Sequence, residues 1–275
     1  MQAPAPSRLP ALVARGPVQT VRAAQAGEEG AGMTDPIRFS HLRAFGRSPM
    51  HGHHARTVEA GQTVAMQRGT AVHALLFGNR KVLGYPGAVR RGKEYDAFVA
   101  DNPDAEILTK TEFDKAIAMA EAVQASNLAM QYLDGESEKT LLFKWYGQDC
   151  RATPDVRGSR FVTELKTTAD ANPARFQWHA LRMQYHAQLA FQMIACKEAE
   201  AAFIVAVESS PPFPVTVYQV SERALEAGEK SLALWMETLI GCEKSNAYPG
   251  YCESLVMLDL PDDEVELDYG DGDGN

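Results

Sequence analysis

The stretch CRATPDVRGSRFVTELKTT, residues 150–168, decides the fold that we predict for this chain. It contains two strand-like runs, residues 150–156 and residues 160–167, joined by the turn residues Arg-Gly-Ser. A tight turn between two such runs predicts an antiparallel hairpin. Each run carries one acid, Asp155 or Glu164, so we expect the two carboxylates on neighbouring strands.

Lys166 follows Glu164 by two positions. Because side chains two apart in a strand point to the same face, we expect Glu164 and Lys166 to lie side by side while Leu165 faces the core. The register of the hairpin can bring Asp155 opposite them. The predicted patch therefore holds two carboxylates and one ammonium group.

A patch of this composition suits phosphodiester hydrolysis. Carboxylate oxygens are ligands for Mg²⁺, which lowers the pKa of a bound water and offsets charge that develops on the phosphate. A neighbouring lysine can orient or deprotonate the attacking water, or stabilise the developing charge. The same spacing also fits a cross-strand salt bridge on a solvent-exposed face, and spacing alone leaves that alternative open.

The rest of the chain predicts helices around this hairpin and strands beside it. Helices are expected at residues 36–49, 69–77, 112–133, 173–196 and 221–245, and further strands at residues 139–145, 201–208 and 215–220. The three strands up to residue 167 are expected to form an antiparallel meander, and the charged region 79–110 to be looser. The order of elements predicts one α/β domain with a mixed sheet.

Two predicted helices place polar side chains where they could reach the patch. Gln184 and Gln188 are four residues apart and are expected to share a helix face, with Tyr185 beside them. An amide and a phenol above a metal site can orient a phosphate or a water. His73 lies in a separate apolar helix, where a single histidine also fits a packed core position.

Taken in order, these motifs resemble the PD-(D/E)XK nuclease superfamily, and within it the RecE-type (exonuclease VIII-like) exodeoxyribonuclease domain of phages and prophages. The motifs that carry the resemblance are SHLRAFGRSP (40–49), GTAVH (69–73), Pro154-Asp155, ELKTT (164–168) and YHAQLAF (185–191). The resemblance covers roughly residues 36–250. It implies a restriction-endonuclease-like α/β core, with a central mixed sheet flanked by helices.

The resemblance also implies roles for individual residues. His73, Asp155 and Glu164 would bind a divalent metal, Mg²⁺ or Mn²⁺, together with the carbonyl of Leu165. Lys166 would act on the attacking water. Gln188 and Tyr185 would position water or DNA.

Further residues are weaker candidates for the same site. Glu136 falls where related phage nucleases place another acid, although it equally fits a surface acid. The candidate DNA contacts are polar or basic residues that could reach phosphate: Ser40, Arg43, Arg47, Arg151 and Gln184. For the arginines, an ordinary solvated surface position is an equal alternative.

The expected activity is a phage-type recombination exonuclease that degrades one strand of linear double-stranded DNA from 5′ to 3′. A single-strand annealing protein would receive the product, and the resemblance implies a homo-oligomeric ring, a trimer or tetramer, in the cytoplasm of a bacterial host. Two alternatives stay open: an endonuclease with the same core, and a non-catalytic DNA-binding module. The presence of all four core positions, Asp155, Glu164, Lys166 and Gln188, argues against the second.

Composition sets the outer limits of this prediction. No apolar run approaches the roughly 18 residues that span a bilayer, so no membrane segment is expected. The four cysteines include no C-x-x-C pair, which argues against a zinc, disulfide or iron–sulfur framework and for a reducing compartment.

Charge and composition also divide the chain. The formal net charge is −9, but seven acids lie within residues 262–275, which leaves −2 for the remainder. A body this close to neutral can still bind phosphate through local basic patches. We expect a disordered extension at residues 1–33, the nuclease domain at 34–258 and a disordered acidic tail at 259–275.

Overall fold

The computed structural model of the chain describes residues 19–20, 35–58, 61–87 and 89–258. The tail predicted at 259–275 and all but two residues of the extension predicted at 1–33 lie outside this part. Those two residues form β1 (Gln19–Thr20), which pairs antiparallel with β5 (Leu141–Trp145). No strand was predicted at these two residues.

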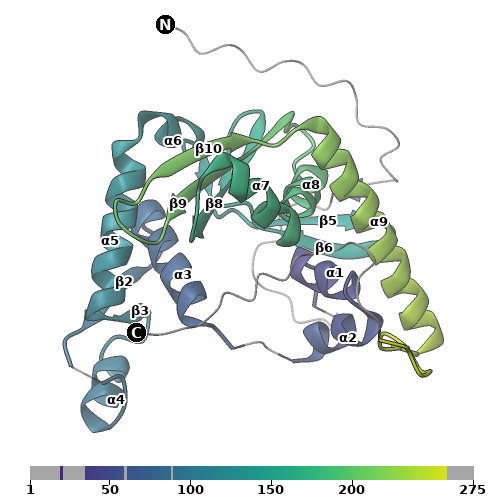
Figure 1. Cartoon of the computed structure of the whole chain (residues 1–275), viewed down its shortest axis with the longest axis horizontal. Helices are drawn as coiled ribbons and strands as arrows, with labels where there is room; N and C mark the ends of the chain where they lie inside the picture. Colours follow the sequence, from purple (N-terminus) through teal and green to yellow (C-terminus); the bar gives the residue numbers. More distant parts are fainter. Residues whose placement is uncertain (1–18, 21–34, 59–60, 88, 259–275) are drawn as a thin grey trace, which may run out of the picture.

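A five-stranded mixed sheet occupies the centre of the molecule, in the order β10-β9-β8-β7-β4 (Figure 1). Its middle strands, β8 (Phe161–Thr168) and β9 (Ala201–Glu208), run parallel. The outer strands, β10 (Val215–Gln219), β7 (Val156–Arg157) and β4 (Glu136–Ser137), all pair antiparallel. The apolar run of β9 is buried from Ala201 to Val207, as predicted, and the predicted mixed sheet is confirmed.

Helices cover both faces of this sheet, and side chains alternate between the two. Leu165 of β8 packs in a cluster with α3 (Val64–Phe77) and α5 (Lys110–Ala125). Val162 of the same strand packs on the other face, in a cluster with α8 (Tyr185–Ala195) and α9 (Glu222–Ser245). Figure 1 shows α5 and α9 on opposite sides of the sheet. Glu164 and Lys166 therefore face α8.

The predicted three-stranded meander is wrong, because its strands belong to two sheets. β5 pairs with β6 (Gln148–Ala152) in a separate sheet, whereas β7 pairs with β8. The strand predicted at 150–156 therefore breaks after Ala152. Pro154 has no N–H to donate to a ladder, which explains the break. Asp155 follows it, at the point where the chain crosses between the sheets.

Two predicted helices are split by capping residues. The helix predicted at 36–49 is α1 (Phe39–Phe45) followed by α2 (Pro49–Thr57), and the Ser48 side chain caps α2. The helix predicted at 112–133 is α5 followed by α6 (Asn127–Tyr132), which Ser126 caps. A Ser side chain that accepts a hydrogen bond from a backbone N–H of the following helix favours a helix start at that point. The preceding helix therefore ends there.

The long helix predicted at 173–196 is also two helices. α7 (Pro173–Arg182) and α8 are separated by Gln184, whose φ of 60° is left-handed. Gln184 precedes α8 as its N-cap, so Gln184 and Gln188 do not share a face of one helix. The final helix, α9, begins after Ser221, as predicted, and the Ser221 side chain caps it.

Residues 79–110 are more regular than expected. They form β2 (Lys81–Tyr85), α4 (Lys93–Ala100) and β3 (Ala105–Thr109), with β2 and β3 parallel. Both strands are five residues long, and Gly84 in β2 and Glu106 in β3 interrupt their apolar patterns. Figure 1 shows α4 projecting beyond the sheet. Among the described residues, no helix combines the length and apolar character needed to cross a bilayer.

Candidate active site

Asp155 is held at the start of the β7–β8 hairpin by two contacts. Its Oδ2 accepts the backbone N–H of Leu165 at 2.7 Å, and its Oδ1 lies 3.4 Å from Nδ1 of His73. The register that pairs Val156 with Thr163 brings Asp155 beside Glu164, as the hairpin predicted.

Glu164 is at the centre of a buried polar network, with 2 % of its surface exposed. Its Oε2 accepts hydrogen bonds from Nζ of Lys166 and from Nε2 of Gln188, the latter at 2.7 Å. Its Oε1 accepts a hydrogen bond from Nε2 of Gln192. The structure thus brings Glu164, Lys166 and Gln188 together. It adds Gln192, which the sequence analysis missed although it lies four residues after Gln188 on the same helix face.

Lys166 spans the network and reaches the solvent side of it. Its Nζ also donates to Oε1 of Gln188 at 3.2 Å and lies 5.0 Å from the ring centre of Tyr185. An ammonium group has three N–H donors. Glu164 and Gln188 take two of them, which leaves one for a substrate oxygen.

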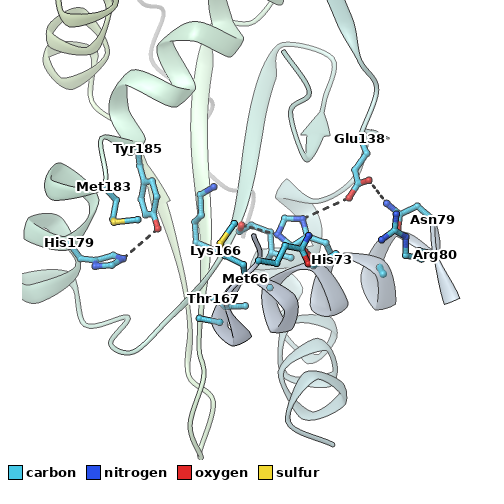
Figure 2. Close-up of a pocket in the computed structure, with 16 residues that line it drawn as sticks. Met66, His73, Asn79, Arg80, Glu138, Lys166, Thr167, His179, Met183 and Tyr185 are labelled. Carbon is cyan, nitrogen blue, oxygen red and sulfur yellow. Dashed lines mark hydrogen bonds and ion pairs between the residues drawn. The ribbon is translucent and has the colours of Figure 1, made fainter. Parts of the chain in front are cut away.

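His73 approaches from α3. Its Nε2 is 3.2 Å from the carbonyl oxygen of Leu165, and its Nδ1 faces Asp155. The same Nδ1 lies 3.9 Å from Oε1 of Glu138, and Asn79 donates a hydrogen bond to the other oxygen, Oε2, of that carboxylate (Figure 2). The lone histidine of the predicted helix therefore belongs to the acidic cluster and is not simply a core residue.

The acid proposed at Glu136 lies away from this cluster. Glu136 is exposed and pairs with Lys139 and Arg157. Glu138 occupies the place near His73 instead, with a left-handed φ of 48° that turns the chain there. The sequence does not show which of the two acids, Glu136 or Glu138, lies near His73, because they are only two residues apart.

The network borders a cavity of about 750 Å³ between α3 and the α7–α8 segment. His73 and Glu138 line one side, Lys166 lies in the middle, and His179 and Tyr185 line the other side (Figure 2). The backbone of Leu165 also borders this space. Substrate in the cavity would therefore meet Lys166 directly.

The two central carboxylates have opposite pKa shifts. Burial raises the pKa of Asp155, but His73, the charge of Lys166 and the N–H of Leu165 together outweigh burial and hold the pKa below its usual value. Burial and the negative charge of Asp155 raise the pKa of Glu164, against the lowering effect of Lys166. Two acids that share one site behave in this way when local positive charge does not balance both.

The two bases respond to the same acids. Burial lowers the pKa of Lys166, but the charges of Glu164 and Asp155 outweigh it and raise the pKa above its usual value. Burial lowers the pKa of His73, and Asp155 likewise reverses the shift. Burial raises the pKa of Tyr185.

The donor set fits a divalent cation. No three His, Cys, Asp or Glu side chains of the described residues form a ready-made metal cluster. Asp155 and Glu164 nevertheless lie side by side in the β7–β8 hairpin, Asp155 accepts the N–H of Leu165, and the Leu165 carbonyl, next to His73, is a further oxygen atom at this place. Oxygen ligands suit Mg²⁺ and Mn²⁺, and the His73 imidazole extends the set.

The weaker DNA-contact candidates are distributed around α1 and the β6 edge. Ser40 and Arg43 are exposed on α1, and Arg43 is near enough to lower the pKa of Tyr185 in opposition to burial. Arg47 donates to the hydroxyl of Tyr251 at 2.8 Å, and Arg151 is half-buried in β6. Among these, Arg43 has an electrostatic link to the cavity.

Comparison with known proteins identifies the family and the fold of the chain. Residues 38–261 match the family described as a PDDEXK-like domain of unknown function (DUF3799). No curated protein matches the chain. A candidate exonuclease from Eubacterium rectale has a similar structure, with a TM-score of 0.59 and 15 % identity, covering 86 % of this chain and 94 % of that one.

A phage-related exonuclease from Haemophilus somnus 129PT matches more weakly. Its TM-score is 0.36 at 10 % identity, covering 78 % of this chain and 98 % of that one. The likeness to the Eubacterium rectale protein shows a shared fold. Because the family match spans most of the chain and contains the whole network around Glu164, this protein belongs to the PDDEXK-like family and has the PD-(D/E)XK nuclease fold.

Proposed function

We propose that this protein is a metal-dependent deoxyribonuclease, a RecE-type exonuclease that degrades one strand of linear double-stranded DNA from 5′ to 3′. One observation carries the proposal. Lys166 is fixed by Glu164 and Gln188 at the wall of the cavity, close enough to Asp155 for their charges to interact. A surface salt bridge would need none of these buried partners.

Members of the PD-(D/E)XK superfamily generally use divalent metal ions. Here Asp155, Glu164 and the Leu165 carbonyl would hold Mg²⁺ or Mn²⁺, with His73 beside them. The ion supplies Lewis-acid chemistry and a water of lowered pKa.

The chain's own residues position the reacting groups. Lys166 has one N–H left to donate, to the attacking water or to a phosphate oxygen that gains negative charge. Gln188 bridges Lys166 and Glu164, so it fixes both side chains in one arrangement. Tyr185 closes the other side of the ammonium group and orients DNA or water.

The proposed activity also requires DNA contacts around the cavity. Ser40, Arg43, Arg47 and Arg151 would contact the phosphates of the DNA end, and Gln184 would lie at its margin. The chain would work as a ring-shaped homo-oligomer, a trimer or tetramer, encoded by a phage or prophage and active in the cytoplasm of the bacterial host. The product strand would pass to a single-strand annealing protein.

The test is incubation of the purified chain with linear and closed circular duplex DNA, with Mg²⁺ and with EDTA. We expect loss of linear DNA only, and only with the metal. Label released first from the 5′ end of the degraded strand would support the polarity. Cutting of circular DNA would favour an endonuclease with this core. If the chain cleaves no DNA with either Mg²⁺ or Mn²⁺, the result would favour a non-catalytic DNA-binding module.

A further inference from the structure

Helix α7 leaves a tryptophan on the surface beside the candidate active site. Phe176 is buried and stacks on Tyr218 with ring centroids 4.7 Å apart, which anchors the helix. Trp178 follows two positions later, about 200° around the helix. Its side chain therefore points away from the anchor and is 68 % exposed. Core packing does not account for this tryptophan.

Two arginines flank this tryptophan on the same helix. Arg175 and Arg182 lie three and four residues from Trp178, the spacings that bring side chains together on a helix surface. Together with His179 they line a cavity of about 270 Å³. An aromatic face and two guanidinium groups thus meet in one hollow.

This second cavity adjoins the active-site cavity. His179 lines both of them, and its Nε2 lies 3.4 Å from the hydroxyl of Tyr185. The ring of Tyr185 in turn lies against the ammonium group of Lys166. Figure 2 shows His179 and Tyr185 on the side of the cavity opposite His73. A strand that leaves Lys166 on this side passes over His179 and reaches Trp178.

The charges favour a phosphate-bearing occupant. Arg175 donates to Oδ2 of Asp170 at 3.1 Å, which offsets part of its charge. The neighbour of Arg182 is Nδ1 of His179, at 3.4 Å, and no carboxylate of the described residues forms an ion pair with Arg182. A positively charged groove with an aromatic platform is the arrangement that binds single-stranded nucleic acid. Inside an intact duplex, each base is already covered on both faces by its neighbours.

We propose that the α7 surface formed by Arg175, Trp178, His179 and Arg182 binds unpaired nucleotides of DNA next to the scissile phosphate. A base stacks on the Trp178 ring and a phosphate contacts Arg182. This inference rests on the proposed deoxyribonuclease function, since His179 connects the surface to that site. An enzyme that removes one strand must separate it from its complement, and this surface holds the separated nucleotides.

The test measures binding of the full chain to a fluorescently labelled, short oligothymidylate in EDTA, where cleavage is not required. We expect Trp178→Ala to weaken binding by about 5- to 150-fold, the effect of losing one stacked base. Trp178→Tyr keeps an aromatic face and should restore most of the affinity. Leu181→Ala is the matched control, because Leu181 is 52 % exposed on the same helix and does not line the cavity.

Two further readouts separate a direct contact from a structural role. Stacking should quench the fluorescence of Trp178 when the oligonucleotide is added, and the quenching should be missing in Trp178→Ala. Arg182→Gln should reduce the slope of log affinity against log salt by about 0.7, the value for one phosphate contact on a single strand. Blunt duplex should bind equally to Trp178→Ala and to the Leu181→Ala control.

Oligothymidylate affinity of Trp178→Ala equal to that of Leu181→Ala, without quenching in the wild type, would overturn the inference. So would sedimentation showing that Trp178 drives association between copies of the chain. If the wild type cuts DNA while Trp178→Ala binds normally, only this inference fails. If binding depends on Trp178 but no DNA is cut, the proposed function fails and the binding surface stands.

Discussion

Nε2 of Gln192 donates a hydrogen bond to Oε1 of Glu164, and both side chains are buried behind the wall of the active-site cavity. Gln188 donates to the other oxygen of the same carboxylate. Two amides from successive turns of α8 therefore fix the orientation of Glu164. Groups that orient a metal-binding carboxylate in this way influence activity without contacting substrate.

Gln192→Leu should therefore lower nuclease activity by about 10- to 100-fold and raise the metal concentration needed for half-maximal rate. DNA binding should change little, because Gln192 does not reach the cavity. Met193→Leu is the control, a volume-conserving change at the next buried position of α8. Equal metal dependence in both variants would show that Gln192 is only a packing residue.

Lys166→Ala should abolish detectable cleavage, a loss of at least about 100-fold, because it removes the one N–H that is available to a reacting oxygen. Folding and DNA binding should be largely retained. The control is Lys144→Ala on β5, which breaks an exposed ion pair with Asp149. Rates of DNA degradation and circular dichroism give both readouts. Full activity of Lys166→Ala would rule out the proposed mechanism.

Asp155→Asn should weaken binding of Mg²⁺ or Mn²⁺, because the amide keeps the shape of the side chain and loses its charge. Titration calorimetry measures the affinity directly, without DNA. Asp149→Asn changes an exposed acid on β6 and should leave the affinity unchanged. Unaltered metal affinity of Asp155→Asn would exclude Asp155 as a ligand.

Gly228→Ala should destabilise the protein by about 1–3 kcal/mol. A Cβ at Gly228 of α9 would lie 2.7 Å from the carbonyl oxygen of His186 and 2.8 Å from Cα of Ala187, so α8 would have to shift. Gly241→Ala, on the same helix with nothing within 4 Å, should instead stabilise it by roughly 0.5–1 kcal/mol. Urea unfolding of both variants is the measurement, and matching shifts would contradict close packing of α8 on α9.

Stability should decrease below neutral pH through His41. Burial, with the charges of Arg56 and Arg38, lowers the pKa of His41 to about 4, from 6.5. Between these values the unfolded chain binds a proton that the folded chain does not. The contribution of uncharged His41 to the free energy of unfolding is therefore complete above about pH 7. It is lost as the pH falls, by about 2 kcal/mol at pH 5.

Replacing this imidazole should flatten the pH dependence. His41→Gln keeps an acceptor for the N–H of Arg38, so urea unfolding at pH 7 and pH 5 should show a smaller loss than in the wild type. His54→Gln, at an exposed position of α2, is the control. A pH dependence identical in His41→Gln and the wild type would refute the assignment.

Some features of the central sheet and of the candidate site were predictable from local patterns. The i, i+2 relation of Glu164 and Lys166, the apolar run of β9 and the cap at Ser221 are properties of short segments, and each was confirmed. The approach of Gln188 followed from motif order, since the sheet brings α8 over β8. Strand alternation and capping act over a few residues, so sequence alone determines them.

Tertiary packing decided the features of the site that local patterns did not predict. Whether Glu136 or Glu138 faces His73 depends on the left-handed turn at Glu138, and Gln192 joins Glu164 only because α8 packs on β8. The exposure of Trp178 likewise depends on which side of α7 the core takes, the side of Phe176. These outcomes are set by contacts between segments far apart in the chain, and such contacts leave no periodic signal in the sequence.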